Sequence, residues 1–272
     1  MIRHLKLYKT FIKNCLIREM EFRVNFFFKT IIYFGWAGLG LFSIHLIFGQ
    51  INTIGNWNKD KIMLLTIVFY VCNAFFKAAL HNNLIEMPRY IRDGNMDFLL
   101  TKPINTRFFV SVRYFNFAHI PRLILFLLLT LKISLTLNPH LEVTELFYAF
   151  MLSCFGILGM YSLIFIISCF AFWKPRVWNL FALVSEFENL AQYPYDIFKG
   201  FLKYIVTLLP LAAFASIPTK FLLGEGSLQL FAWGISISII FFHSFRSYLE
   251  TWIKKVWKRI ILRYSYNAVY RS

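Results

Sequence analysis

Residues 146–173 have the sequence LFYAFMLSCFGILGMYSLIFIISCFAFW, in which no side chain carries a charge. An α-helix rises about 1.5 Å per residue, so about 20 apolar residues cross about 30 Å of hydrocarbon. This stretch is longer than that, so we expect the helix to tilt, to bend near Gly156 and Gly159, or to continue beyond the membrane. The stretch predicts a transmembrane helix, and it decides the class of the whole chain.

The composition of the 272 residues agrees with a membrane protein. Hydrophobic residues make up 58% of the chain, aromatic residues 20% and charged residues only 15%, whereas soluble domains carry about 25% charged residues. So few charges cannot cover a soluble globule, and so apolar a chain is neither disordered, nor collagen-like, nor a small disulfide-linked domain. We therefore expect an all-α integral membrane protein.

Six segments of the sequence approach the length of a membrane span. The third contains Arg122 and Lys132, whose side chains could extend to opposite membrane interfaces. The fifth contains Pro210 and Pro218, which membrane helices tolerate when neighbours satisfy the freed carbonyl groups. The predicted spans are residues 30–48, 62–80, 115–137, 146–173, 204–223 and 228–245, between an N-terminal segment 1–29 and a basic tail 246–272.

The formal net charge of +16 is explained by topology rather than by nucleic acid. Nearly all of the 29 Lys and Arg residues lie before span one, between spans two and three, between spans four and five, or after span six. Only Lys59, Lys61 and Lys220 lie on the opposite side. Because cytoplasmic loops are enriched in Lys and Arg, we expect a multi-pass protein of the cytoplasmic membrane with both termini in the cytoplasm. No nucleic-acid partner is implied.

Two segments outside the predicted spans have the pattern of amphipathic helices. In residues 1–29, apolar residues gather on one face and basic residues on the other. This predicts a helix that lies on the lipid of the inner leaflet or, alternatively, a lever that moves the first span. Residues 178–192 have an apolar stripe opposite a polar face that includes Glu186 and Glu188. We expect this second helix to be cytoplasmic, either docking on protein or covering its own bundle.

Residues 91–105, IRDGNMDFLLTKPIN, form the most distinctive loop segment. The residue types predict a short helix ending near Arg92, a turn at Gly94, an apolar turn at residues 98–100 and a stop before Pro103. Such a segment is a compact cytoplasmic elbow that presents charged residues beside apolar ones. A surface of this kind suits a partner protein.

This elbow resembles that of the six-span ABC-2 type permeases, the membrane subunits of ATP-binding cassette exporters, and in particular their viologen-exporter-like branch. Three further elements are similar to that branch: YPYDIF at residues 193–198, Pro210 and Pro218 followed by LLG at residues 222–224, and the basic tail with WKR at residues 257–259 and RYS at residues 263–265. The tail departs from the family only at residues 266–269, YNAV, where the family usually has Ser-Ala-Gly. The resemblance covers the chain essentially end to end.

The resemblance implies further subunits. A separate ATP-binding cassette ATPase would bind ATP and contact the elbow, and a second permease, identical or different, would complete the pathway. No Gly-x-x-x-x-Gly-Lys-Ser/Thr phosphate loop occurs in this chain, so we expect it to be non-catalytic and to hold no cofactor of its own. By resemblance, the residues that couple to the ATPase are Arg92, Gly94, Asp97, Leu99, Leu100 and Pro103.

No reactive or metal-binding cluster is recognisable from the sequence. The six His residues are far apart, and no His-x-x-x-His pair occurs. Arg122 and Lys132 could line a path for anionic or amphipathic cargo, or could extend to the interfaces or pair across a dimer. Gly156 and Gly159 belong to a run of small residues at every third position, which could pack within the chain or against a second permease.

The sequence therefore predicts the permease subunit of an ATP-binding cassette exporter that moves an amphipathic or hydrophobic substrate. An ATP-independent secondary transporter or channel is the first alternative. Against it, every Asp and Glu lies outside the predicted spans, so the usual proton-relay side chains are missing. A membrane-embedded enzyme or an assembly scaffold is the second alternative. The sequence determines neither the substrate nor whether the two permeases are identical.

Overall fold

The computed structural model describes residues 2–93, 109, 111–169, 178–244 and 247, and most of them are helical. Two short strands, β1 (Thr53–Ile54) and β2 (Trp57–Asn58), pair antiparallel. The expectation of an all-α protein is confirmed. The helices are α1 (Ile2–Glu21), α2 (Arg23–Ile47), α3 (Lys59–Phe76), the π-helical η1 (Lys77–His81), α4 (Asn82–Arg92), the 3-10 helix η2 (Phe117–His119), α7 (Ile120–Leu137), α8 (Val143–Cys169), α9 (Trp178–Leu190), α10 (Gly200–Leu208), the π-helical η4 (Ala212–Ser216), α11 (Ile217–Leu222) and an unlabelled helix, Leu228–Ser244.

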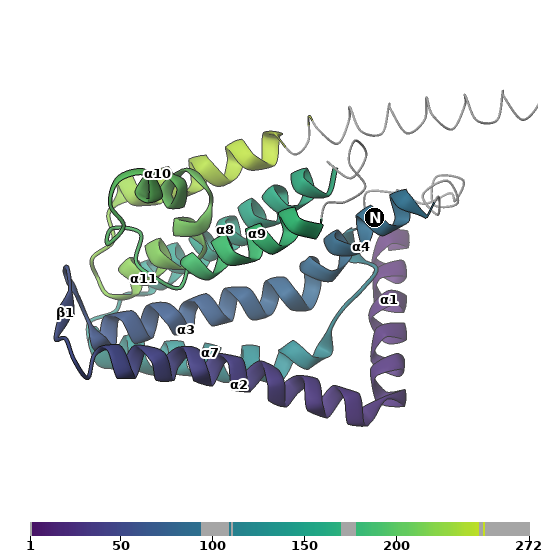
Figure 1. Cartoon of the computed structure of the whole chain (residues 1–272), viewed down its shortest axis with the longest axis horizontal. Helices are drawn as coiled ribbons and strands as arrows, with labels where there is room; N and C mark the ends of the chain where they lie inside the picture. Colours follow the sequence, from purple (N-terminus) through teal and green to yellow (C-terminus); the bar gives the residue numbers. More distant parts are fainter. Residues whose placement is uncertain (1, 94–108, 110, 170–177, 245–246, 248–272) are drawn as a thin grey trace, which may run out of the picture.

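The long helices form a bundle around α3. Figure 1 shows α2, α3, α7 and α8 running lengthwise together, with the β1–β2 hairpin at one end, here called the hairpin end, and α1 crossing the other, here called the α1 end. Inside this bundle, 72% of the apolar stretch of Lys59–Tyr90 is buried, against 11% of that of Arg23–Ile47. The central position therefore belongs to α3, while α2 presents its apolar side chains outward, as a helix in contact with lipid does.

Local signals explain where the two most closely packed helices begin. The side chain of Asn58 accepts a hydrogen bond of 3.0 Å from the backbone N–H of Lys61, which caps α3. At the other end of the bundle, Asn116 accepts a hydrogen bond of 3.1 Å from the N–H of Ala118, and Pro121 lies in the first turn of α7. These caps set the starts of α3 and α7, which pack along each other in opposite directions.

The first four predicted spans correspond to helices of sufficient length. In the described part of the chain, four helices are long and apolar enough to cross a membrane by length and composition: Arg23–Ile47, Lys59–Tyr90, Phe117–Leu137 and Val143–Cys169. They include most of the predicted spans 30–48, 62–80, 115–137 and 146–173. The chain is thus a multi-pass membrane protein. The sixth predicted span coincides with a shorter apolar helix, Leu228–Ser244.

The fifth predicted span, residues 204–223, is not a straight helix. Instead, Gly200–Leu208 and Ala212–Leu222 meet at an angle of 68°, with Pro210 at the break. Asp196, shortly before this pair, accepts hydrogen bonds from Trp57 Nε1 at 2.9 Å and from Lys220 Nζ, near the end of the pair, at 2.7 Å. Both ends of the bent pair therefore lie at the hairpin end. By length and composition the bent pair counts as one broken span or as a re-entrant loop, so the fifth span stays a prediction.

The amphipathic helix predicted at residues 178–192 is present as α9 and packs on its own bundle, one of the two alternatives. It contacts α8 and α3, and Glu188 of its polar face is buried. After α9 the chain runs beside α3 toward the hairpin end. Two hydrogen bonds show this path: Thr66 donates to the carbonyl of Gln192 at 3.5 Å, and Trp57 donates to the Asp196 carboxylate. Lys199 belongs to the basic residues between spans four and five, for which the charge pattern predicts a cytoplasmic position. It follows Asp196 in the chain and so lies toward the hairpin end, the same end as Lys59.

The N-terminal helix ends earlier than the predicted segment 1–29. The chain leaves helical geometry at Phe22 (φ −106°, ψ 56°), after which α2 begins at Arg23. Helix α1 packs on the chain that leads into α7: the backbone N–H of Phe115 donates to Cys15 Sγ at 3.4 Å, and that of Phe117 donates to Glu19 at 3.3 Å. Burial raises the pKa of Glu19, while the Phe117 hydrogen bond opposes this shift. The position of α1 on an inner leaflet stays a prediction.

Candidate functional site: a polar cavity between four helices

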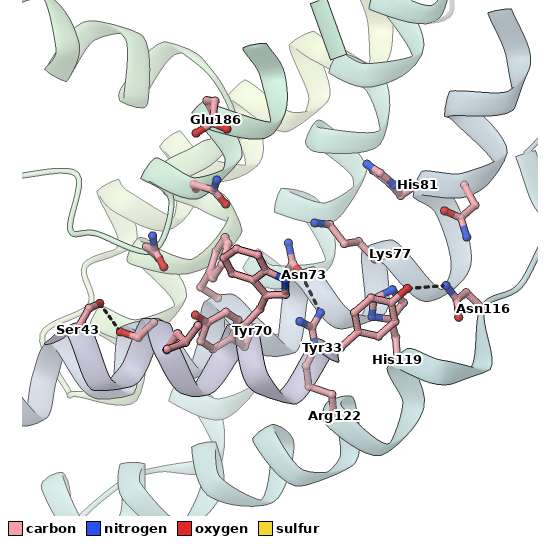
Figure 2. Close-up of a pocket in the computed structure, with 17 residues that line it drawn as sticks. Tyr33, Ser43, Tyr70, Asn73, Lys77, His81, Asn116, His119, Arg122 and Glu186 are labelled. Carbon is pink, nitrogen blue, oxygen red and sulfur yellow. Dashed lines mark hydrogen bonds between the residues drawn. The ribbon is translucent and has the colours of Figure 1, made fainter. Parts of the chain in front are cut away.

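A cavity of about 820 Å³ lies among α2, α3 with η1, the start of α7, and α9 (Figure 2). Its volume falls within the range of small-molecule sites, about 300–1,000 Å³. Its lining combines aromatic side chains, including Tyr33, Trp36 and Tyr70, with basic and polar ones. Polar side chains inside an apolar bundle are costly and commonly mark a ligand path, so this cavity is the candidate functional site.

A chain of hydrogen bonds crosses the bundle beside the cavity. Arg122 on α7 donates from Nη2 to Asn73 Oδ1 at 2.9 Å, and Asn73 on α3 donates from Nδ2 to the carboxylate of Glu188 on α9. All three side chains are buried, with at most 5% of their surface exposed. Because a buried charge is strongly unfavourable without compensation, the Asn73 amide links the cation to the anion and stabilises both.

This network bears on two predictions. Arg122 does not extend to the outside of the bundle: it is buried within the bundle and bonds to α3. Glu188 lies outside the predicted spans, as expected, yet α9 brings this acidic side chain into the bundle, where it is buried. A polar Asn73 within the apolar stretch 62–80 was the available signal, because a side-chain amide inside a span needs partners on neighbouring helices.

Aromatic rings position the basic residues of the cavity. The guanidinium of Arg122 lies 5.9 Å from the ring centres of both Tyr33 and Tyr70, within the range of cation–π attraction. The imidazole of His119 stacks on the ring of Tyr33 with the ring centres 4.0 Å apart. Tyr33 on α2 thus contacts two basic side chains at the start of α7. These contacts hold α2 against the basic residues of the cavity.

Four basic side chains meet at the cavity although they are distant in sequence: Lys77, His81, His119 and Arg122. In Figure 2, Lys77 and His81 come from one helix and His119 and Arg122 from another, whereas Glu186 lies apart from them. Within each pair, the spacing of four or three residues places both side chains on one helix face. That spacing was the sequence signal, but only the packing of α3 against α7 brings the two pairs together.

Two polar atoms at this site are buried without a hydrogen-bond partner. Among the described residues, Nε of Arg122 and Nδ1 of His119 have no partner, although other atoms of both residues make contacts. Buried polar atoms are satisfied in the great majority of cases. These two atoms lie in the basic part of the cavity, and a bound group with hydrogen-bonding atoms would satisfy them there.

The other residues singled out from the sequence lie elsewhere. Lys132 is exposed on α7 and does not line the cavity, so the structure does not bring it together with Arg122. Arg92 ends α4 at the α1 end. The remaining elbow residues, Gly94, Asp97, Leu99, Leu100 and Pro103, lie outside the described residues, as does nearly all of the tail 246–272.

Gly156 and Gly159 allow α8 to approach the bent helix pair closely. A Cβ on Gly156 would overlap the backbone of Ala213 and Phe214, and one on Gly159 would lie 2.5 Å from Cβ of Pro210. Both glycines thus pack within the chain, which was one of the two alternatives. Across the described residues, no group of three or more His, Cys, Asp or Glu side chains is arranged to hold a metal ion.

Comparison with known families agrees with this helical membrane architecture. A family model described as "ABC-2 family transporter protein" matches residues 34–265, which is most of the chain and includes all the residues that line the cavity except Tyr33. A comparison with curated proteins finds no match.

Proposed function

Because the chain belongs to the ABC-2 family of transporter proteins, we propose that it is the membrane permease subunit of an ATP-driven exporter. It moves an amphipathic or hydrophobic substrate across the cytoplasmic membrane, and a separate ATP-binding cassette subunit hydrolyses the ATP. The observation that carries the proposal is the family match over residues 34–265. Assignment to the viologen-exporter-like branch rests on the sequence resemblance alone.

The polar cavity supports a transport role. It lies between α2, α3, α7 and α9, so a relative movement of these helices would change its shape and access. Its lining combines aromatic residues with basic ones, a composition that accommodates a molecule with an apolar and a polar part. The Arg122–Asn73–Glu188 network joins three of the four helices, so its hydrogen bonds would have to lengthen or break when these helices move apart.

The chain on both sides of the elbow supports coupling to an ATPase at that place. Helices α3, η1 and α4 run continuously from the hairpin end to Arg92, so a displacement of the elbow would be passed along α3 to Asn73. On the other side, α1 contacts residues 113–117, which precede α7. The proposed contact comprises Arg92, Gly94, Asp97, Leu99, Leu100 and Pro103, and a second permease, identical or different, completes the pathway.

Site-specific crosslinking tests this assignment. A photo-crosslinking amino acid at Asp93, an exposed residue of the elbow, is expected to trap an ATP-binding subunit in native membranes. The matched control is Glu142, exposed just before α8 near the hairpin end. A product that contains an ATP-binding subunit at position 93 and not at 142 supports the proposal. Equal products at both positions, or none at 93, count against the elbow as the contact.

One observation favours a second candidate, an ion-coupled secondary transporter. Glu188 is a buried acid within the bundle, and such residues often act as proton carriers in membrane proteins. Its hydrogen bond from Asn73 links it to Arg122, which gives it a structural role as well. Flux driven by a proton gradient through the purified chain alone, and lost in Glu188→Gln, would establish this alternative. Flux that requires the ATPase and ATP would exclude it.

A further inference from the structure

We propose that the cavity binds an amphipathic anion, with a phosphate or carboxylate headgroup between Lys77 and Arg122 and an apolar tail along α2. This deepens the proposed function by naming the substrate class, and it rests on that function. The binding step itself is a property of this chain and can be measured without the ATPase.

The headgroup position follows from the donors that remain available. Arg122 uses Nη2 for Asn73, while its buried Nε has no partner among the described residues. The buried Nδ1 of His119 is likewise without a partner there. Lys77 lines the same cavity on η1. A headgroup oxygen can accept hydrogen bonds from Nε of Arg122 and from the Lys77 ammonium, and such charge-assisted bonds are the strong ones.

The acidic side chains near the cavity do not cancel this preference. Glu188 accepts a hydrogen bond from Asn73, and through that amide it compensates Arg122. Glu186 is exposed on α9, and Figure 2 shows it well away from Lys77 and Arg122. Lys77 also interacts electrostatically with Glu188, although none of the ion pairs found among the described residues involves it. The single negative charge of Glu188 offsets only one of the two positive charges of Lys77 and Arg122, so one positive charge is left for a ligand.

The apolar part of the ligand follows from α2. Trp36 and Leu39 line the cavity, yet 70% and 61% of their surfaces are exposed. The cavity therefore opens along the apolar outer face of α2, the face expected to meet lipid. An anion that carries a hydrocarbon tail can place the tail on this face and its headgroup inside the cavity. A small hydrophilic ion would make no favourable contact with the apolar face of α2.

Equilibrium binding of radiolabelled decyl phosphate tests the proposal. The full-length chain is placed in phosphatidylcholine nanodiscs, and binding to empty nanodiscs is subtracted. Saturable binding of decyl phosphate is expected, with little competition from decyltrimethylammonium or inorganic phosphate. Absence of saturable binding overturns the proposal. Equal competition by the cation overturns the charge assignment, and equal competition by inorganic phosphate overturns the assignment to an amphiphile.

Three lysine variants locate the site. Lys77→Gln is expected to weaken decyl phosphate binding about tenfold or more, because a hydrogen bond to a charged group is lost, while Lys77→Arg retains most of it. Lys132→Gln, which removes an exposed lysine outside the cavity, is expected to leave binding unchanged. Equal effects of Lys77→Gln and Lys132→Gln contradict the proposal.

A fourth variant distinguishes loss of a tail contact from general misfolding. Trp36→Ala alters an exposed residue of α2 and is expected to weaken binding of decyl phosphate more than that of ethyl phosphate, since only the former has a long tail. Equal losses for both probes overturn the placement of the tail. Crosslinking at Asp93 reports the ATPase contact independently, so failure of binding with an intact ATPase contact rejects the substrate class and leaves the proposed function standing.

Discussion

Asn73 on α3 accepts a hydrogen bond of 2.9 Å from Arg122 on α7, and neither side chain has more than 5% of its surface exposed. The same amide donates to Glu188 on α9, so one neutral side chain separates and satisfies two buried charges. The relationship explains how a helix with an arginine in its first turns can lie within an apolar bundle.

Replacing Asn73 should destabilise the protein more than any exposed amide does. Asn73→Leu leaves Arg122 and Glu188 buried without their shared partner, and we expect a loss of about 3–5 kcal/mol in the free energy of unfolding. Asn189→Leu, on the exposed face of α9, is the control and should have little effect. Thermal unfolding of the purified chain measures both. Equal stability of Asn73→Leu and wild type would show that the network does not contribute to the free energy of unfolding.

Arg122 and Glu188 should be energetically coupled although they do not bond directly. We expect Arg122→Met and Glu188→Gln each to destabilise the chain, and the double variant to lose less than the sum of the two. The expected difference is about 0.5–3 kcal/mol, because each single change leaves the opposite group uncompensated. The free energies of unfolding of the four proteins complete the cycle. Simple additivity would mean that Asn73 does not connect the two charges.

The close packing of α8 against η4 predicts a large difference between two glycine substitutions. Gly156→Ala places a methyl group on the backbone of Ala213 and Phe214, and should cost about 1–3 kcal/mol. Gly38→Ala, on α2, meets nothing within 4 Å, and should be neutral or stabilise the helix by about 0.5–1 kcal/mol. Thermal unfolding in detergent compares them. A harmless Gly156→Ala would be inconsistent with this packing.

Residue Lys199 should be accessible from the same side of the membrane as Lys59. We expect Lys199→Cys and Lys59→Cys to react with a membrane-impermeant maleimide added to whole cells, and Lys6→Cys to react only after permeabilisation. The expected labelling of position 199 follows from the hydrogen bond between Asp196 and Trp57, which places this part of the chain at the hairpin end. The native Cys residues are first replaced by Ser so that only the introduced Cys reacts. Labelling of Lys199→Cys together with Lys6→Cys would instead restore the cytoplasmic assignment made from the charge pattern.

The elbow variants should separate insertion from coupling. Asp97→Lys and Gly94→Val are expected to leave the amount of chain in the membrane unchanged and to abolish the stimulation of ATP hydrolysis by substrate. Glu142→Gln, an exposed change just before α8 and far from the elbow in the chain, is the control. Quantitative immunoblots of membranes and ATPase assays of the isolated complex give the two readouts. Normal coupling in both elbow variants would remove Asp97 and Gly94 from the proposed contact.

The helices of the first four spans could be predicted because a long uncharged run has few structural alternatives. The starts of α3 and α7 also follow local rules, with Asn58 and Asn116 as caps. Pro210 and Pro218 are visible too, yet a proline in an apolar stretch does not distinguish a kink within a span from a break between two helices. The hydrogen bonds of Asp196 to Trp57 and Lys220, which no local pattern reveals, place both ends of that segment together.

The site was less predictable because amphipathicity does not identify what a polar face meets. The pattern of α9 is compatible with solvent and equally with a polar cavity inside a bundle, and the structure has the second arrangement. Similarly, the sequence shows that Arg122 lies inside an apolar stretch but not that Asn73 lies opposite. Lys132 looked equivalent to Arg122, and only packing distinguishes the buried residue from the exposed one.

Isolation of the tagged chain from its native membranes in a mild detergent tests the central claim most directly, with ATP hydrolysis measured in the eluate. The account predicts that an ATP-binding subunit co-elutes and that the complex hydrolyses ATP, whereas the chain separated from it does not. A chain that elutes without any ATP-binding subunit, and that transports substrate on its own in proteoliposomes, would contradict the account.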